Sequence, residues 1–216
     1  MQPLHFSSVI ELIPETYVAP LDLLTIFGRV APLHVDLGCG DGSFLCELAQ
    51  RYPDQNFLGT ERLVGRVAKS CQKSADLENV RVLNVESSYA VRYLLPAGSV
   101  ETFYLLFPDP WPKRRHHRRR IVNTDFLDSI HRALENGGVL QIATDQFDYF
   151  RQIERLARAS SLQVSEKLDG LKPSSLRRET SSDQNGNFPL TKFERRFTTL
   201  AAPIYRLVLR KISPVR

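Results

Sequence analysis

The sequence predicts a single α/β domain in which a mostly parallel sheet carries helices on both faces. Three observations lead to this prediction. From residue 33 onward, short apolar runs alternate with amphipathic helical segments, and the connections between them are short, as in a parallel sheet covered on both faces. A glycine-rich turn follows the first apolar run and opens the first helix. The length of 216 residues suits one domain with a core of stable size.

Each strand is predicted from a short apolar run, and each helix from apolar residues at helical spacing. The predicted strands are 33–37, 56–60, 80–85, 100–107, 139–143, 162–168 and 204–209. The predicted helices begin near residues 44, 63, 89, 124, 147 and 191. Asn123 or Thr124 is expected to cap the helix after the fourth strand, and Gly137-Gly138 to end it. Right-handed crossovers would then place the loops that follow the strands along one edge of the sheet.

Two segments fall outside this alternation. Residues 1–32 contain four prolines and little periodicity, so they are predicted to form an N-terminal arm with a short helix at 22–27, and the domain is predicted to span 33–216. Residues 170–190 are mostly polar and rich in Ser, Asn and Gly. They are predicted to be a mobile loop within the domain.

The composition excludes several classes of protein. A hydrophobic content of 42% and a charged content of 25% are typical of soluble globular proteins. No apolar run approaches the roughly 20 residues of a membrane helix. The first residues lack the charged-then-apolar pattern of an export leader, so export is not expected. Cys39, Cys46 and Cys71 lack CxxC spacing, which favours reduced thiols over a disulfide set or a zinc site. We therefore expect a cytoplasmic protein without membrane or metal, either monomeric or homodimeric.

The stretch FPDPWPK at residues 107–113, called here the Asp109 loop, is the strongest candidate site. It follows a buried strand, and its three prolines forbid both helix and ladder, so the chain leaves the sheet in a stiff loop. Asp109 lies between two of the prolines and beside Trp111, the single tryptophan. A rigid loop with an acid and an aromatic plane favours a site for a nucleic-acid base over a plain proline-stiffened turn.

A basic run follows directly. The net charge of the chain is +5, and residues 113–120 alone contribute more positive charge than this. A solubilising surface would intersperse both signs, so the run predicts a polyanionic partner whose phosphates it contacts. The predicted backbone contacts are Arg114, Arg115, Arg118, Arg119 and Arg120.

The glycine-rich turn predicts a ligand-binding loop. Gly38 and Gly40 follow the first strand, where glycine lets backbone N–H groups approach a ligand at the N-terminus of a helix. A dinucleotide fingerprint needs a third glycine at the position that Ser43 occupies. This departure argues against NAD, and the absence of a lysine from the turn argues against ATP.

Acidic residues end each of the first three predicted strands: Asp36, Glu61 and Glu86. Each alone reads as a strand end or a helix cap. Together at one edge of the sheet they favour a positively charged nucleoside, with Glu61 placed to hold ribose hydroxyls. The pattern therefore indicates a sulfonium cofactor.

Five blocks together resemble the bacterial tRNA (guanine-N7-)-methyltransferase family. They are DLGCGDG at 36–42, GTER at 59–62, LLFPDPWPKRRHHRRR at 105–120, ATD at 143–145 and TKFE at 191–194. The resemblance covers about residues 33–210. It implies a class I, Rossmann-like fold that uses S-adenosyl-L-methionine, with a seven-stranded sheet whose last strand is antiparallel. It also implies methylation of a guanosine in the variable loop of tRNA.

The resemblance also implies roles for individual residues. Asp36 stands where the family usually has Glu, and Glu86 where Asp is common, with Ser87 and Ser88 as alternatives for the adenine contact. The implied cofactor contacts are Asp36, Glu61, Glu86 and Asp109, and Asp109 is also the implied catalytic residue. The implied substrate contacts are Lys113, Asp145, Thr191, Lys192, Phe193 and Glu194. Trp111 is equally suited to stack on the base or to pack the loop.

Two other functions compete with this one. An exocyclic amino methyltransferase places an (Asn/Asp)-Pro-Pro-aromatic motif after the fourth strand, and Asp109-Pro110-Trp111 resembles it without the second consecutive proline. A non-catalytic RNA-binding relative would have lost the glycines or the acids, and both are present here.

Overall fold

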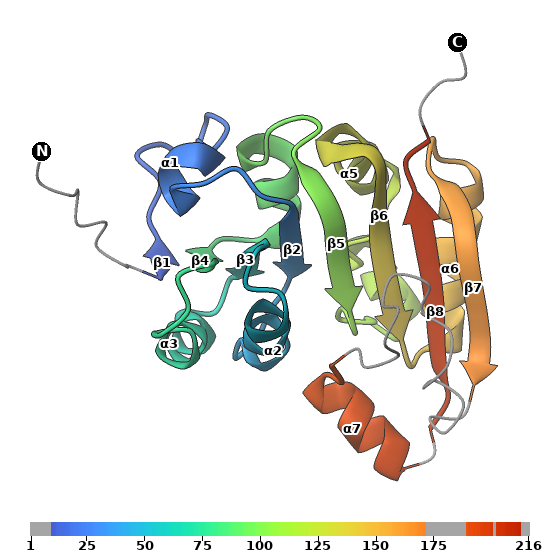
Figure 1. The fold of residues 1–216 in the computed structure, drawn as a ribbon. Coiled ribbons are helices and arrows are strands. Elements are labelled where there is room, and N and C mark those ends of the chain that lie inside the picture. Colours follow the sequence, from blue (N-terminus) through green and yellow to red (C-terminus); the bar gives the residue numbers. More distant parts are fainter. Residues whose placement is uncertain (1–9, 172–188, 201, 213–216) are drawn as a thin grey trace, which may run out of the picture.

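The structure, a computed structural model, describes residues 10–171, 189–200 and 202–212. These residues form one eight-stranded sheet with helices on both faces (Figure 1). The strands are β1 (Glu11–Leu12), β2 (Leu33–Leu37), β3 (Asn56–Glu61), β4 (Val80–Asn84), β5 (Val100–Leu106), β6 (Leu134–Thr144), β7 (Gln163–Leu171) and β8 (Ile204–Arg210). Their order across the sheet is β1-β4-β3-β2-β5-β6-β8-β7.

The mostly parallel sheet predicted from the sequence is confirmed. Every pairing is parallel except those of β8, which runs antiparallel to both β6 and β7. The sheet has eight strands rather than seven, because Glu11 and Leu12 pair with Val82 and Leu83 at its edge. A strand of two residues is too short to show an alternating pattern, so the sequence did not reveal it.

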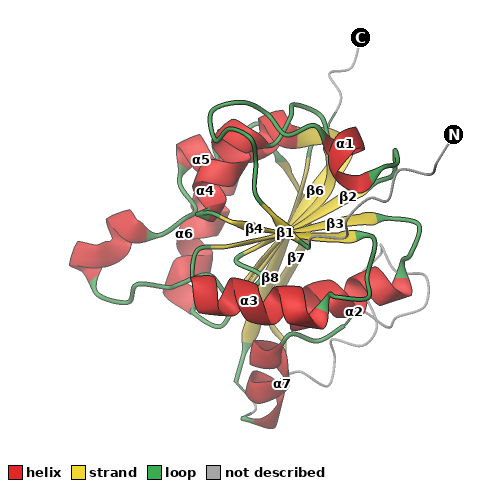
Figure 2. Cartoon of the chain, turned by 90° about the vertical axis from the view of Figure 1, so that its left-hand side faces the viewer, coloured by secondary structure: helices red, strands yellow, loops and turns green. Residues whose placement is uncertain are grey.

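The helices form two layers. They are α1 (Leu23–Phe27), α2 (Ser43–Arg51), α3 (Val64–Lys73), α4 (Ser87–Tyr89), α5 (Thr124–Ala133), α6 (Phe147–Arg158) and α7 (Lys192–Thr199), with a π turn η1 (Ala90–Leu94) and a 3₁₀ helix η2 (Arg114–Arg119). Figure 2, a view along the sheet, shows α2 and α3 on one face and α1, α4, α5 and α6 on the other. No helix of the described residues is long and apolar enough to cross a membrane.

Strand β5 contributes to the cores on both faces. Its Phe103 and Leu105 pack in the cluster formed with α1, α5 and α6, and its Tyr104 packs in the cluster formed with α2 and α3. Full burial of a large apolar side chain stabilises the fold by about 1.5–3 kcal/mol. The segment that leaves the end of β5 therefore starts from a firmly held strand.

One predicted helix end was wrong. Asn123 caps α5 as expected, since its Oδ1 accepts a hydrogen bond from Phe126 N at 2.9 Å. The helix ends at Ala133, however, and Gly137-Gly138 lie inside β6. A Cβ on Gly138 would lie 2.9 Å from the carbonyl oxygen of Glu101. Glycine is required there by a close approach between β5 and β6 and not by a helix end.

The two segments outside the alternation are described in part. Asp22 caps α1 by accepting from Thr25 N at 3.1 Å, and Ile10, Leu21 and Phe27 are buried. These three residues anchor parts of the predicted arm on the domain. Of the predicted loop, residues 170–171 belong to β7, and 172–188 lie outside the described residues. The division into an arm and a domain stays a prediction.

Candidate functional site

The carboxyl ends of the parallel strands bring two predicted loops together. Strands β2 and β5 are parallel neighbours, and Asp36 lies opposite Tyr104. The glycine loop (residues 38–42) and the Asp109 loop therefore begin at nearly the same height on the same edge of the sheet. Helix α7 lies at this edge too, below the arrowheads of the parallel strands in Figure 1. The candidate site is built from these three segments.

The glycines of the glycine loop serve two purposes. Gly38, Gly40 and Gly42 have φ angles of +80°, +59° and +75°, a region that favours glycine. A Cβ on Gly38 or Gly40 would meet nothing within 4 Å, whereas one on Gly42 would lie 2.2 Å from Ser70 Oγ. Gly38 and Gly40 thus border open space that a ligand can enter. Gly42 is needed for the packing of α3 against the loop.

This difference predicts distinct effects of alanine at the glycines. Gly42→Ala combines the strain of a positive φ with a clash, and should lower the free energy of unfolding by about 2–4 kcal/mol. Gly98→Ala is the matched control, because Gly98 has a φ of +64° and no atom within 4 Å of its Cβ position; it should cost only about 1–2 kcal/mol. Urea unfolding curves measure both. Equal losses would show that Ser70 moves aside without cost.

Asp36 is a buried acidic residue near the end of β2. It is 5% exposed, and no group of the described residues donates a hydrogen bond to its side chain. Burial and, second, the nearby charge of Glu61 raise its pKa to about 7. A cation at the glycine loop would favour the ionised carboxylate and so lower this pKa. The site therefore favours a positively charged ligand.

The other two predicted strand-end acids differ. Glu61 is 5% exposed, accepts from Leu63 N at 2.9 Å and has Arg66 Nη1 at 3.7 Å. Glu86 is exposed and caps α4, accepting from Tyr89 N at 3.0 Å and from Ser88 Oγ at 2.8 Å. The structure thus brings Glu61 together with Asp36, while Glu86 and Ser88 bind each other.

The remaining alternative, Ser87, is buried. Its hydroxyl lies 2.9 Å from Thr60 Oγ1 at the end of β3. The hydroxyl is therefore already engaged in joining the start of α4 to the neighbouring strand.

The Asp109 loop is strained on both sides of Asp109. Phe107 and Trp111 have φ angles of 54° and 43°, a region that costs a non-glycine residue about 1–3 kcal/mol and persists only when the surroundings impose it. Phe107 N donates to Ala143 O at 2.8 Å, which ties the loop to β6. Asp109 lies between the strained positions with its side chain exposed. The prolines predicted stiffness, but nothing in the sequence indicated the strain.

Trp111 packs within the loop. The guanidinium carbon of Arg119 lies 4.9 Å from its ring centroid, and the ring of His116 meets it edge-on at 5.8 Å. These contacts fasten η2 to the Asp109 loop. Of the two roles open for Trp111, packing is the one that its contacts support.

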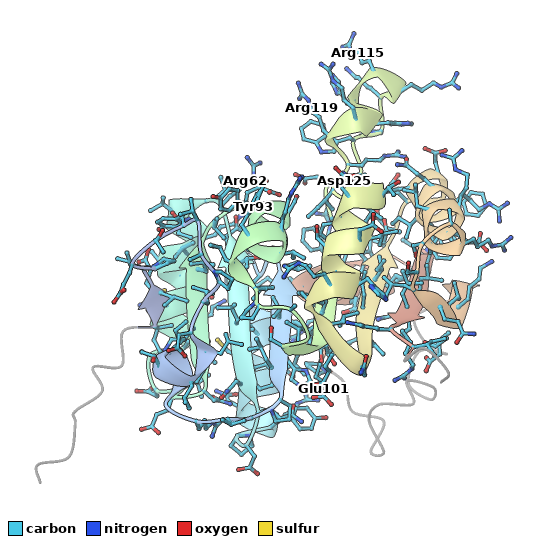
Figure 3. All side chains as sticks on the ribbon, turned by 90° about the horizontal axis from the view of Figure 1, so that it is seen from above. Arg62, Tyr93, Glu101, Arg115, Arg119 and Asp125 are labelled. Atoms are coloured by element: carbon cyan, nitrogen blue, oxygen red, sulfur yellow. The ribbon has the colours of Figure 1, made fainter. Side chains whose placement is uncertain are left out.

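The basic run forms η2, which projects from the sheet with Arg115 near its far end and Arg119 closer to the sheet (Figure 3). The exposed members of the run are Lys113, Arg114, Arg115, Arg118 and Arg119. Arg120 differs, because its side chain is 2% exposed. Its contact with RNA phosphates stays a prediction, and the burial of its side chain argues against that contact.

The predicted TKFE block divides into a buried inner half, Thr191 and Glu194, and an exposed outer half, Lys192 and Phe193. Thr191 and Glu194 form the expected capping box, with Thr191 N donating to Glu194 Oε2 at 2.7 Å and Glu194 N donating to Thr191 Oγ1 at 3.1 Å. Glu194 is 1% exposed and also pairs with Arg206 of β8. Lys192 and Phe193 are 67% and 51% exposed. The outer half is thus the part of α7 that a substrate can reach.

Helix α7 contacts both the Asp109 loop and the glycine loop, and no sequence motif predicted these contacts. The rings of Phe193 and Phe197 lie 5.7 and 5.4 Å from that of Phe107. Lys192 pairs with Asp41 of the glycine loop, and Lys73 Nζ lies 2.5 Å from the same carboxylate. Burial opposes ionisation of Asp41, but the hydrogen bonds from Lys192, Lys73 and Ser43 outweigh it and lower the pKa.

Asp145 directly follows β6, beside the Asp109 loop. It is half-buried, and its carboxylate accepts from Gln146 Nε2 at 2.7 Å. Strands β5 and β6 are parallel neighbours, with Leu106 opposite Ala143. Asp145 therefore lies at the same edge of the sheet as the glycine loop and the Asp109 loop. Among the described residues, no group of three or more His, Cys, Asp and Glu side chains is arranged to hold a metal ion.

Comparison with known proteins identifies a family. The family described as "Putative methyltransferase" matches residues 30–207. The tRNA (guanine-N(7)-)-methyltransferase of Thermotoga maritima is 34% identical over 206 residues, which cover 94% of this chain and 62% of that protein. The protein of the same name from Leifsonia xyli is 38% identical over 195 residues, covering 89% of this chain and 82% of its own length. The chain thus spans about three-fifths of the first relative and four-fifths of the second.

Solved structures share the fold at low sequence identity. An antibiotic-related methyltransferase matches with a TM-score of 0.63 and 16% identity, covering 94% of this chain and 98% of that one. The 16S rRNA methyltransferase KamB matches with a TM-score of 0.62 and 15% identity, covering 88% and 92%. The class I methyltransferase fold expected from the sequence is therefore confirmed.

Proposed function

Because the chain belongs to the tRNA (guanine-N(7)-)-methyltransferase family, we propose that it transfers the methyl group of S-adenosyl-L-methionine to N7 of a guanosine in the variable loop of tRNA. The observation that carries this proposal is the position of the strained Asp109 loop beside the glycine loop and its buried Asp36. Since tRNA is its substrate, the protein acts in the cytoplasm.

The residues around the glycine loop fit this cofactor. When bound, it supplies a methyl group made reactive by a sulfonium charge. Gly38 and Gly40 offer open backbone for a close approach, and Asp36 provides a buried negative charge for a cationic group. Glu61, at the end of β3, holds the ribose hydroxyls. Glu86 and Asp109 complete the proposed cofactor contacts, Glu86 through its place at the start of α4.

Asp109 orients the base. Guanine N7 carries a lone pair in the plane of the ring, so it attacks a methyl group without losing a proton and needs no strong general base. The protein's task is alignment in a short, linear transfer. The exposed carboxylate of Asp109 accepts hydrogen bonds from the N1–H and N2–H₂ edge of guanine. This contact rejects adenine and stabilises the positive charge that develops on the methylated ring.

The remaining substrate contacts surround Asp109. Asp145 reaches the base from the end of β6, and Lys113 from the start of the basic run. Lys192 and Phe193 approach from the exposed half of α7, which Thr191 and Glu194 hold in place through the capping box. The exposed arginines of η2 grip phosphates next to the target guanosine, which must leave its place in the folded tRNA before it can react.

Neutralising the exposed arginines should weaken RNA binding in a salt-dependent way. In Arg115→Ala/Arg118→Ala, the KM for tRNA is expected to rise, and the slope of log K against log salt to fall by about 1 for each lost phosphate contact. Arg151→Ala/Arg155→Ala on α6 removes the same charge from another exposed surface and serves as the control. Binding titrations at several salt concentrations measure both variants. An unchanged slope in the η2 variant would assign that surface another role.

Nucleoside identification tests the proposed reaction. Unmodified bulk tRNA is incubated with the protein and S-adenosyl-L-methionine, digested to nucleosides and analysed by mass spectrometry. N7-methylguanosine is expected. N6-methyladenosine or N4-methylcytosine would instead indicate the exocyclic amino reaction, and cofactor binding without any methylated nucleoside would indicate a non-catalytic RNA-binding protein.

A further inference from the structure

The basic run consists of η2 and the residue on either side of it. Arg120 is the one buried residue of this run. Its side chain is 2% exposed, whereas Arg118 and Arg119, directly before it, are exposed. It follows the last residue of η2, where the chain turns back toward the domain. Its sequence context suggests one more phosphate contact, but its burial calls for another role.

The guanidinium of Arg120 connects the Asp109 loop to helix α6. Its Nε donates to the carbonyl oxygen of Pro110 at 2.8 Å. Its Nη1 donates to Gln152 Oε1 at 2.5 Å, and its Nη2 donates to Asp148 Oδ2 at 3.0 Å. The guanidinium carbon also lies 4.6 Å from the ring centroid of Tyr149. All three nitrogens are therefore engaged, and Asp148 balances the charge.

The two ends of this connection differ in rigidity. Tyr149 is fully buried in the core and α6 packs on the sheet, so that end is fixed. The other end is the peptide that joins Pro110 to Trp111, and it lies directly between Asp109 and the strained φ of Trp111. A donor fixed to α6 that holds this carbonyl opposes rotation of the strained peptide. Only Pro110, whose ring fixes its φ, separates Asp109 from this peptide, so the orientation of Asp109 depends on how the peptide is held.

We propose that Arg120 is a positioning residue, which holds the Asp109 loop in its strained conformation from helix α6 so that Asp109 meets the guanine edge, and that it does not bind RNA. The inference rests on the proposed function, because Asp109 needs orientation only if it meets a substrate. A planar fork with three engaged nitrogens is specific to arginine, since lysine offers a single point of attachment.

The test compares Arg120→Gln and Arg120→Lys with Arg118→Gln, a neighbour with an exposed side chain. We expect both Arg120 variants to lower kcat for tRNA methylation by about 10- to 100-fold, as displaced catalytic groups do, with KM for tRNA and the salt slope of binding close to those of the wild type. Arg118→Gln should instead raise KM and reduce the salt slope by about 1. Adding guanidinium ion to Arg120→Gly, against a sodium chloride control of equal ionic strength, should restore part of kcat.

Three results would overturn the proposal. Arg120→Lys with the kcat of the wild type would show that only the charge matters, and a reduced salt slope in Arg120→Gln would show an RNA contact. If Arg120→Gln fails to fold, Asp148→Asn decides, because Asp148 is 78% exposed and its loss should leave the melting temperature intact while lowering kcat several-fold. An unchanged kcat in that variant would end the proposal. A wild-type protein that does not methylate tRNA would instead refute the proposed function.

Discussion

Replacing Asp109 with alanine is expected to slow methyl transfer by about 10²- to 10³-fold, as the loss of a preorganised electrostatic contact does, while cofactor affinity falls much less. The carboxylate is exposed, and the strain of the loop lies at Phe107 and Trp111 on either side of it. Removing it would therefore take away the proposed contact to the base without releasing the loop. The free energy of unfolding should change by less than about 0.5 kcal/mol.

Single-turnover methylation of tRNA measures the rate in Asp109→Ala, and calorimetry measures its affinity for S-adenosyl-L-methionine. Asp54→Ala is the matched control, since Asp54 is also exposed but lies between α2 and β3, at the opposite end of the strands. A tRNA with inosine in place of the target guanosine lacks the N2 amino group that Asp109 is proposed to bind. The wild-type protein should therefore methylate it more slowly. Turnover retained by Asp109→Ala would remove this residue from the chemistry.

Asp36→Asn is expected to weaken S-adenosyl-L-methionine binding by about 10- to 100-fold at pH 8, because it removes the buried negative charge that we propose to face the cationic ligand. Burial and the charge of Glu61 raise the pKa of Asp36 to about 7 in the free protein. A bound cation would hold this carboxylate ionised, so binding below pH 7 must release a proton. Affinity in the wild type should therefore rise with pH up to about 7 and then level off.

The same substitution should stabilise the free protein. The pKa of Asp36 is raised from 3.8 to about 7, so between these values the folded state holds a proton that the unfolded state lacks. The free energy of unfolding of the wild type therefore falls as the pH rises from about 4 to 7 and stays level above that. A neutral amide in place of the carboxylate carries no such charge, so Asp36→Asn should gain up to about 4 kcal/mol at pH 8.

Calorimetry between pH 5.5 and 8.5, in buffers of different ionisation enthalpy, measures affinity and proton release together, and urea unfolding at the same pH values measures stability. Glu61→Gln is the informative companion, because removing the charge of Glu61 should move the pH midpoint of binding downward. The same affinity and pH profile in Asp36→Asn and the wild type would exclude Asp36 from cofactor binding.

Much of the fold and of the candidate site could be predicted from short sequence patterns. The glycines of DLGCGDG predicted an open turn between β2 and α2, and Gly38 and Gly40 border open space there. The prolines around Asp109 predicted a loop that leaves the sheet at the end of β5. In both cases the residues that determine the conformation are neighbours in the sequence, so the pattern could be read directly.

Contacts between distant segments could not be predicted in this way. Lys192 pairs with Asp41, 151 positions earlier, and Arg206 pairs with the buried Glu194. Charged residues are usually exposed, so sequence composition gave Arg120 the same role as its neighbours. Its burial depends on where α6 lies, which only the folded chain reveals.

Cleavage of tRNA at N7-methylguanosine tests most directly the central claim, that the Asp109 loop and the glycine loop together direct a methyl group to guanine N7. Unmodified tRNA is treated with the protein and tritiated S-adenosyl-L-methionine, then with borohydride and aniline, which break the chain at that nucleoside. We predict scission at one variable-loop guanosine with the wild type, and little or none with Asp109→Ala. Label incorporated into tRNA that stays intact under this treatment would contradict the claim.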